Sequence, residues 1–137
     1  MTGCNKTLVE VYRRESLSFL QYVRQATPYA GAKDKPLLDR VREMAQSELT
    51  EIEKLVDYLD RSRVTLPHIG AFPSEFTNYN FVAIRNLVPL LIADESRGLK
   101  ELERDAGSMT SGEARERLEK LIETKRTHLG ELQKLAM

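Results

Sequence analysis

Apolar residues recur at spacings of three and four along most of the chain, which is the period of an amphipathic α-helix. Four such stretches predict helices over about residues 5–26, 34–62, 78–106 and 111–135, separated by segments that contain proline, glycine or polar residues. Few stretches alternate with the period of two that a half-buried β-strand shows. The pattern therefore predicts an all-α fold in a single domain that spans residues 1–137.

The connections between the predicted helices indicate how they are arranged. A short link after the first helix makes the first two helices antiparallel neighbours. Residues 64–79, called the crossover below, form a much longer connection with two prolines and one glycine between the second and third helices. At about 3.3 Å per residue, the crossover is long enough to run the length of a bundle. We therefore predict an up-down bundle of four helices with one long crossover, as in ferritin-like proteins.

Each predicted helix also carries an ionisable residue near the middle of its apolar stripe. These residues are Glu15 in the first helix, Glu48 and Glu51 in the second, Glu95 in the third, and Lys125 and His128 in the fourth. A buried carboxylate without a partner is costly, so it takes up a proton, pairs with a cation or coordinates a metal. The four helices are therefore expected to bring these side chains together at mid-height.

Several of these assignments have alternatives. Ile52 competes with Glu51 for the direction of the core, so a solvated Glu51 is as consistent with the pattern as an inward one. Asp94 becomes the inward carboxylate in place of Glu95 if Pro89 turns the third helix. The apolar residues of the crossover either pack against the bundle or, if exposed, mark the interface of a homodimer.

Composition and charge narrow the classes of function. The 21 basic and 21 acidic residues cancel, and no basic stripe with interleaved aromatic residues is present, so we expect no nucleic-acid partner. Cys4 is the single cysteine and cannot form an internal disulfide. The longest apolar run, residues 87–93, is far shorter than the roughly twenty residues of a membrane span. We expect a cytoplasmic protein without a membrane partner.

The types and positions of these polar residues are also similar to those of a known protein family. Ferritin-like bundles hold two metal ions with one Glu from each of two helices and a Glu-x-x-His from each of the other two. The chain resembles this superfamily, particularly its small rubrerythrin-like members: residues 44–51 are similar to its second helix, and the Lys-x-x-His of residues 125–128 stands where its fourth helix has Glu-x-x-His. The resemblance implies retained metal ligands at Glu15, Glu48, Glu95 and His128, an altered ligand at Glu51 and no ligand at Lys125.

Lys125 changes the charge balance of such a site. Four glutamates against one ammonium leave three negative charges, which one divalent ion nearly neutralises, whereas a second ion would lie against the lysine. We therefore expect at most one Fe or Mn ion. Its hard oxygen ligands would be Glu15, Glu48 and Glu51, with His128 and Glu95 on the lysine side.

Two main hypotheses for function follow. The first is a ferritin-like protein with an altered, mononuclear metal site, which implies metal binding or oxygen and peroxide chemistry. The second is a metal-free, degenerate ferritin-like bundle in which Lys125 and His128 replace the metal ions in a buried network. Such a bundle would act as a structural or protein-interaction module, with a homodimer formed through the crossover or a bundle face. A third hypothesis is a small-molecule pocket beside Pro89. The sequence does not decide whether the chain is an enzyme.

Overall fold

The computed structural model describes residues 2–26 and 28–136, most of which lie in five α-helices. These are α1 (Gly3–Ser16), α2 (Phe19–Ala26), α3 (Lys35–Arg61), α4 (Ile84–Gly107) and α5 (Glu113–Leu135), with a 3-10 helix, η1 (Ser74–Tyr79), inside the crossover. Within these ranges the only extended pairing is an isolated bridge between Tyr29 and Ala83. The prediction of an all-α fold is confirmed. None of the described helices is both long and apolar enough to cross a membrane.

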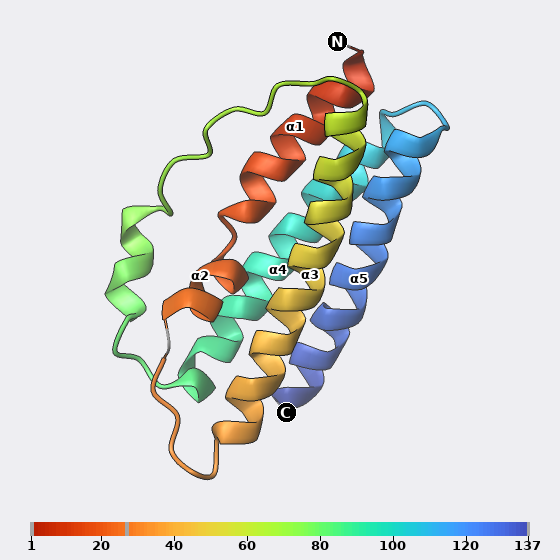
Figure 1. Ribbon diagram of the computed structural model, residues 1–137. Helices are drawn as coiled ribbons and strands as arrows, with labels where there is room; N and C mark the ends of the chain where they lie inside the picture. Colours follow the sequence, from red (N-terminus) through yellow and green to blue (C-terminus); the bar gives the residue numbers. More distant parts are fainter. Residues whose placement is uncertain (1, 27, 137) are drawn as a thin grey trace.

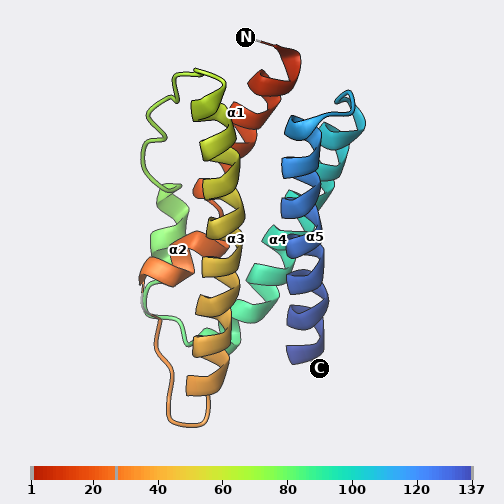
Figure 2. The same cartoon turned by 45° about the vertical axis from the view of Figure 1, so that its right-hand side comes forward.

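The helices form a bundle in which the crossover sets the direction of α4. Figure 1 shows α1 and α2 running down the bundle and α3 running back up. The crossover then descends on the outside through η1, so that α4 begins at the same end as α3 and runs parallel to it, and α5 returns in the opposite direction (Figures 1 and 2). Both α3 and α4 pack mainly against α5 and the α1–α2 pair, so α3 and α4 lie diagonally across the bundle.

The hydrophobic core has two halves with a polar layer between them. One half contains buried residues of α1, α3, α4 and α5, including Leu8, Leu55, Leu102 and Leu118. The other half contains buried residues of α2, α3, α4 and α5, including Leu20, Val41, Leu91 and Leu132. The buried ionisable side chains fall between these two sets along each helix that carries one. The charged positions therefore lie near mid-height in the bundle, between the two apolar halves.

The first predicted helix is interrupted at Leu17 and Ser18, which divide it into α1 and α2. Ser18 acts as an N-cap, because its Oγ accepts a hydrogen bond of 3.3 Å from the backbone N–H of Gln21. Across the bundle, Asp94 Oδ2 on α4 accepts the backbone N–H of Phe19 at 3.0 Å. A carboxylate at a helix N-terminus is favourable, because the first N–H groups have no partner inside the helix. Hydrogen bonds to Ser18 and to Asp94 therefore both stabilise the break.

The third predicted helix starts several residues later than the apolar pattern suggests. Residues 74–79 form η1 instead, and α4 begins at Ile84, whose backbone N–H donates to the carbonyl of Tyr29 at 2.9 Å. Phe81, which the helical period places on the inward stripe, lies outside α4 and is 97% exposed. The hydrogen bond between Ile84 and Tyr29 joins the start of α4 to the link before α3, which is more than fifty residues away in the sequence. A local sequence pattern does not reveal such a contact.

Candidate functional site

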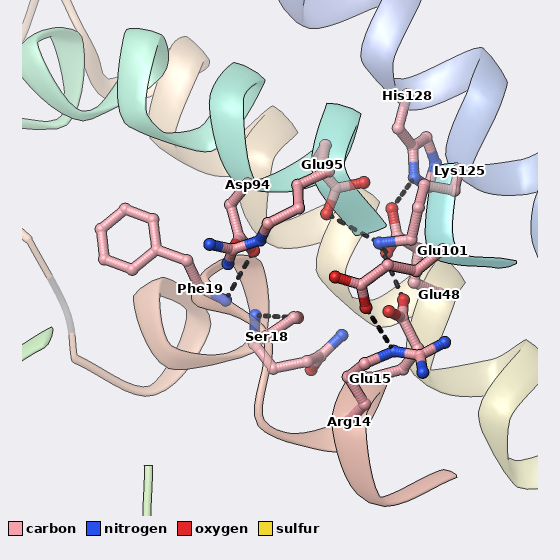
Figure 3. A network of polar contacts seen from close by, with 12 residues as sticks. Arg14, Glu15, Ser18, Phe19, Glu48, Asp94, Glu95, Glu101, Lys125 and His128 are labelled. Atoms are coloured by element: carbon pink, nitrogen blue, oxygen red, sulfur yellow. Dashed lines mark hydrogen bonds and ion pairs between the residues drawn. The ribbon is translucent and has the colours of Figure 1, made fainter. Parts of the chain in front are cut away.

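Four helices place ionisable side chains at the centre of the bundle. Glu15 comes from α1, Glu48 from α3, Glu95 from α4, and Lys125 and His128 from α5 (Figure 3). Each of these residues is at most 5% exposed. Each one takes a position that the helical period turns toward the core, and each except His128 has apolar residues three or four positions both before and after it. The amphipathic pattern therefore accounts for the burial of these positions, and the packing of the helices brings them together.

The ammonium group of Lys125 lies where the three carboxylates meet. Its Nζ is 2.8 Å from Glu15 Oε1 and 3.1 Å from both Glu48 Oε1 and Glu95 Oε1. The contacts with Glu48 and Glu95 are hydrogen bonds that Lys125 donates, and the contact with Glu15 is an ion pair. A lysine ammonium has three N–H donors and no acceptor, so three carboxylates match its capacity. One side chain of α5 thus joins α1, α3 and α4.

His128 extends the network by one further contact. Its Nδ1 is 2.8 Å from Glu48 Oε2, so the two oxygens of Glu48 contact Lys125 and His128 separately. Burial lowers the pKa of His128, and the nearby charges of Arg40 and Lys125 lower it further, against an opposing influence of Glu95. The imidazole is therefore held in its neutral form, in which a protonated Nδ1 donates to Glu48.

The network also shifts the pKa values of Lys125 and Glu95. Burial by itself lowers the pKa of Lys125, but attraction to Glu15, Glu95 and Glu48 outweighs it and holds this pKa well above its usual range. Burial is the largest influence on Glu95 and raises its pKa well above the usual range, with Glu48 and Glu15 adding to the effect and Lys125 opposing it. Lys125 is therefore firmly charged, and Glu95 is a carboxyl group that readily keeps a proton.

Glu51 is not part of this network. Its carboxylate pairs with Lys54 on the same helix at 3.4 Å, and its side chain is 17% exposed. Ile52 takes the inward direction and is 3% exposed. Of the two readings of this position from the sequence, the structure shows the one in which Glu51 faces away from the core.

Glu95 rather than Asp94 is the inward carboxylate of α4. Glu95 is fully buried beside Lys125, whereas Asp94 lies at the edge of the bundle, where it caps α2 and pairs with Arg97. Sequence reasoning missed this capping role of Asp94. It also missed Gly98, one turn after Glu95, where a Cβ atom would lie 3.4 Å from Glu15 Oε2 and 3.5 Å from Lys125 Nζ. A glycine inside an amphipathic helix was the available signal of such a close approach.

A metal ion at the centre of these side chains would meet the ammonium group of Lys125. Within residues 2–26 and 28–136, no three His, Cys, Asp or Glu side chains are arranged so that they could hold one. The physical reason is that a charged ammonium lies at the point where the three carboxylates meet, and Glu51 points away from it. Of the five predicted ligands, the structure gathers Glu15, Glu48, Glu95 and His128, and it gathers them around Lys125.

No known protein family, curated protein or solved structure matches this chain. The fold and the site define it as an all-α helical bundle with a buried polar layer centred on a lysine.

Proposed function

We propose that this protein is a metal-free ferritin-like bundle that serves as a structural or protein-interaction module. The observation that carries the proposal is the position of Lys125, whose Nζ lies within 3.1 Å of carboxylates from three other helices. In a ferritin-like bundle the metal ions join the helices at this height. Here the ammonium group makes the equivalent connection, so the bundle is held together without metal chemistry.

The course of the chain supports the ferritin-like part of the proposal. Its crossover descends along the bundle between two parallel helices, α3 and α4, and those helices lie diagonally (Figures 1 and 2). One long crossover between the second and third helices is the connectivity of ferritin-like folds. The polar layer at mid-height is the second shared feature, with a lysine in place of the Glu of one Glu-x-x-His pair.

The proposed role as a module follows from what the network can do. Lys125 lies within 3.1 Å of three carboxylates and has a raised pKa, so it is a poor nucleophile or base. A buried charged network of this kind fixes which helices face one another, because any other arrangement leaves a charge unpaired. The proposed partner is a second copy of the chain, through the crossover or a bundle face. Two large side chains of the neighbouring links, Tyr29 before α3 and Phe81 before α4, are 67% and 97% exposed.

The altered metal site is the second candidate. It is favoured by the convergence of Glu15, Glu48, Glu95 and His128, four of the side chains that a ferritin-like site requires. Binding one Fe or Mn ion there would require Lys125 to lose its proton or leave the centre. The raised pKa of Lys125 opposes the first step, and burial at 1% exposure opposes the second.

Metal content distinguishes the two candidates. Wild-type protein, purified without chelator and loaded with Fe(II) or Mn(II), is compared by elemental analysis with Lys125→Glu, which restores a Glu-x-x-His sequence, and with Lys125→Met, which removes the charge without adding a ligand. We expect no stoichiometric metal in the wild type and a gain in Lys125→Glu. About one metal ion per wild-type chain would overturn the proposal in favour of the mononuclear site.

A further inference from the structure

Two aromatic side chains point into solvent near the end of the bundle at which α3 and α4 begin (Figure 1). Phe81 is 97% exposed and Tyr29 is 67% exposed, and among the described residues one other large apolar side chain, Leu135, is exposed, at 40%. Both rings line one open hollow of about 780 Å³. The whole lining, called the end patch below, consists of Tyr22, Gln25, Ala26, Tyr29, Asn80 and Phe81.

The two links that carry these rings are fastened to each other. Tyr29 precedes α3 and Phe81 precedes α4. The backbone N–H of Ile84, at the start of α4, donates to the carbonyl of Tyr29 at 2.9 Å. The hydroxyl of Tyr22 on α2 donates to Asn80 Oδ1, which holds the residue before Phe81 against α2. Both rings therefore extend from a pre-organised backbone, and an aromatic side chain with two rotatable bonds loses little entropy on binding.

The end patch carries no acidic or basic side chain. Its polar groups are two amides and two phenols, each of which can donate and accept a hydrogen bond. Asp34, just before α3, and Arg85, in the first turn of α4, pair with each other at 2.6 Å, so their charges cancel. Such a surface is complementary to its own copy, whereas a patch of one charge would repel its copy. The formal net charge of zero also removes the general repulsion between two chains.

The exposed rings supply much of the area that a weak dimer needs. An aromatic side chain carries about 200 Å² of surface, so at these exposures the two rings offer roughly 330 Å² per copy. Two copies contribute about 650 Å² from the rings alone, which leaves about a third of the ~1,000 Å² of a specific interface to the other four patch residues. The expected contact is therefore of the weak, reversible class.

A ring and a hollow lie side by side on this surface, and a two-fold symmetric pair can use such an arrangement twice. We propose that the end patch is the interface of a closed homodimer, in which Phe81 of each copy enters the hollow beside α2 of the other. The two-fold axis makes both contacts identical, so the pair closes and no third copy is added. This inference rests on the proposed role as an interaction module and assigns the surface that carries it.

Sedimentation velocity from about 5 μM to about 1 mM measures the association of the wild-type protein directly. We expect an equilibrium between monomer and dimer with a Kd on the order of 100 μM and no larger species. The melting temperature should rise with protein concentration over the same range, because pairing stabilises only folded copies. A monomer at about 1 mM, or assembly that continues beyond two copies, would overturn the proposal.

Phe81→Ser removes the ring that enters the hollow. Because Phe81 is 97% exposed, the monomer fold does not depend on it, and the melting temperature of dilute protein should be unchanged. We expect dimerisation at least about thirtyfold weaker, since each pair loses two buried rings. Leu135→Ser is the matched control, because it removes an exposed apolar side chain outside the end patch, at the end of α5, and should leave the Kd within about twofold.

Wild-type dimerisation in Phe81→Ser would overturn the assigned surface and leave the homodimer of the proposed function in place. The metal analysis is independent of these measurements, so a metal in the wild type and a missing dimer are separate results.

Mixing two impaired variants tests whether the contact is reciprocal. Ala26→Arg places a charged side chain in the hollow, and arginine suits the last turn of α2. Each variant alone loses both contacts of the pair. A mixture of Ala26→Arg with Phe81→Ser keeps one contact, between the intact ring of the first variant and the intact hollow of the second. We expect the mixed pair to form at least about tenfold more tightly than either variant alone. A mixture that binds no more tightly than its components would overturn the pairing of ring and hollow.

Discussion

Replacing Lys125 by methionine removes the charge at the centre of the bundle while keeping a side chain of similar length. Three carboxylates then remain together with no ammonium between them, in a layer where each is at most 3% exposed. At an effective dielectric constant of about 20, two unit charges 3 Å apart attract by roughly 5 kcal/mol, and desolvation offsets much of this. Removing one partner of a buried ion pair costs about 3–5 kcal/mol in the free energy of unfolding.

This loss is large enough to measure by urea denaturation at neutral pH, and it corresponds to a fall of about 10–15 °C in melting temperature for a chain of this size. Lys120→Met is the matched control, because Lys120 is exposed on the same helix. We expect the control to stay within about 0.5 kcal/mol of the wild type.

The loss of stability in Lys125→Met should also depend on pH, in a direction that the carboxyl groups determine. Without the ammonium, burial and mutual repulsion raise the folded-state pKa values of the clustered carboxyl groups above those of the unfolded chain. Their protonated forms are then favoured in the folded state, so the penalty of Lys125→Met is smallest at acidic pH and grows as the pH rises. A change below about 1 kcal/mol at neutral pH, or a penalty that grows on acidification, would refute the account of the network.

Three further substitutions test the surrounding contacts. Because burial raises the pKa of Glu95 above 4.5, its favourable contribution is lost as the pH rises through the raised value, so the stability of Glu95→Gln relative to wild type should increase with pH in urea titrations. Because burial lowers the pKa of His128 below 6.5, wild-type stability should fall as the pH drops through that region, and His128→Gln should flatten this part of the profile; an unchanged slope would contradict the neutral imidazole. Asp94→Ala removes the contact with the Phe19 N–H and should cost about 1 kcal/mol, with faster amide hydrogen exchange in α2.

The burial of the polar layer was predictable from the sequence, because helical periodicity turns these positions toward the core. Glu15, Glu48, Glu95, Lys125 and His128 each replace an apolar residue in a stripe of period 3.6, and all five are buried. The all-α class follows from the same signal. The metal-ligand assignment stays a prediction, because the pattern places these side chains on one level but does not say which of them lies at the centre.

The break in the first helix was not predictable from local sequence. The apolar stripe continues from Leu8 to Val23 without a glycine or proline between them, so the periodicity predicts one continuous helix. What stabilises the break is partly the carboxylate of Asp94, which is distant in the sequence and reaches the N–H of Phe19 only after the bundle has formed. Tertiary contacts of this kind override helix propensity.

The cavity beside Glu15 was missed for the same reason. This cavity, of about 440 Å³, is lined by residues of α1, of the crossover and of α4, among them Glu15, Phe76 and Gly98. The third hypothesis from the sequence placed a pocket beside Pro89 instead. Proline marks a local change in a helix, whereas this cavity results from the meeting of three segments that a single apolar pattern does not connect.

The charge state and location of Lys125 can be observed directly by 1H–15N spectroscopy of lysine side-chain ammonium groups at neutral pH. The account predicts one ammonium signal protected from exchange with water, absent in Lys125→Met, and unchanged when Zn(II) is added as a diamagnetic competitor for the carboxylates. A protected signal that disappears on addition of Zn(II), or no protected ammonium at all, would contradict the claim that a charged lysine lies at the centre of the carboxylate cluster.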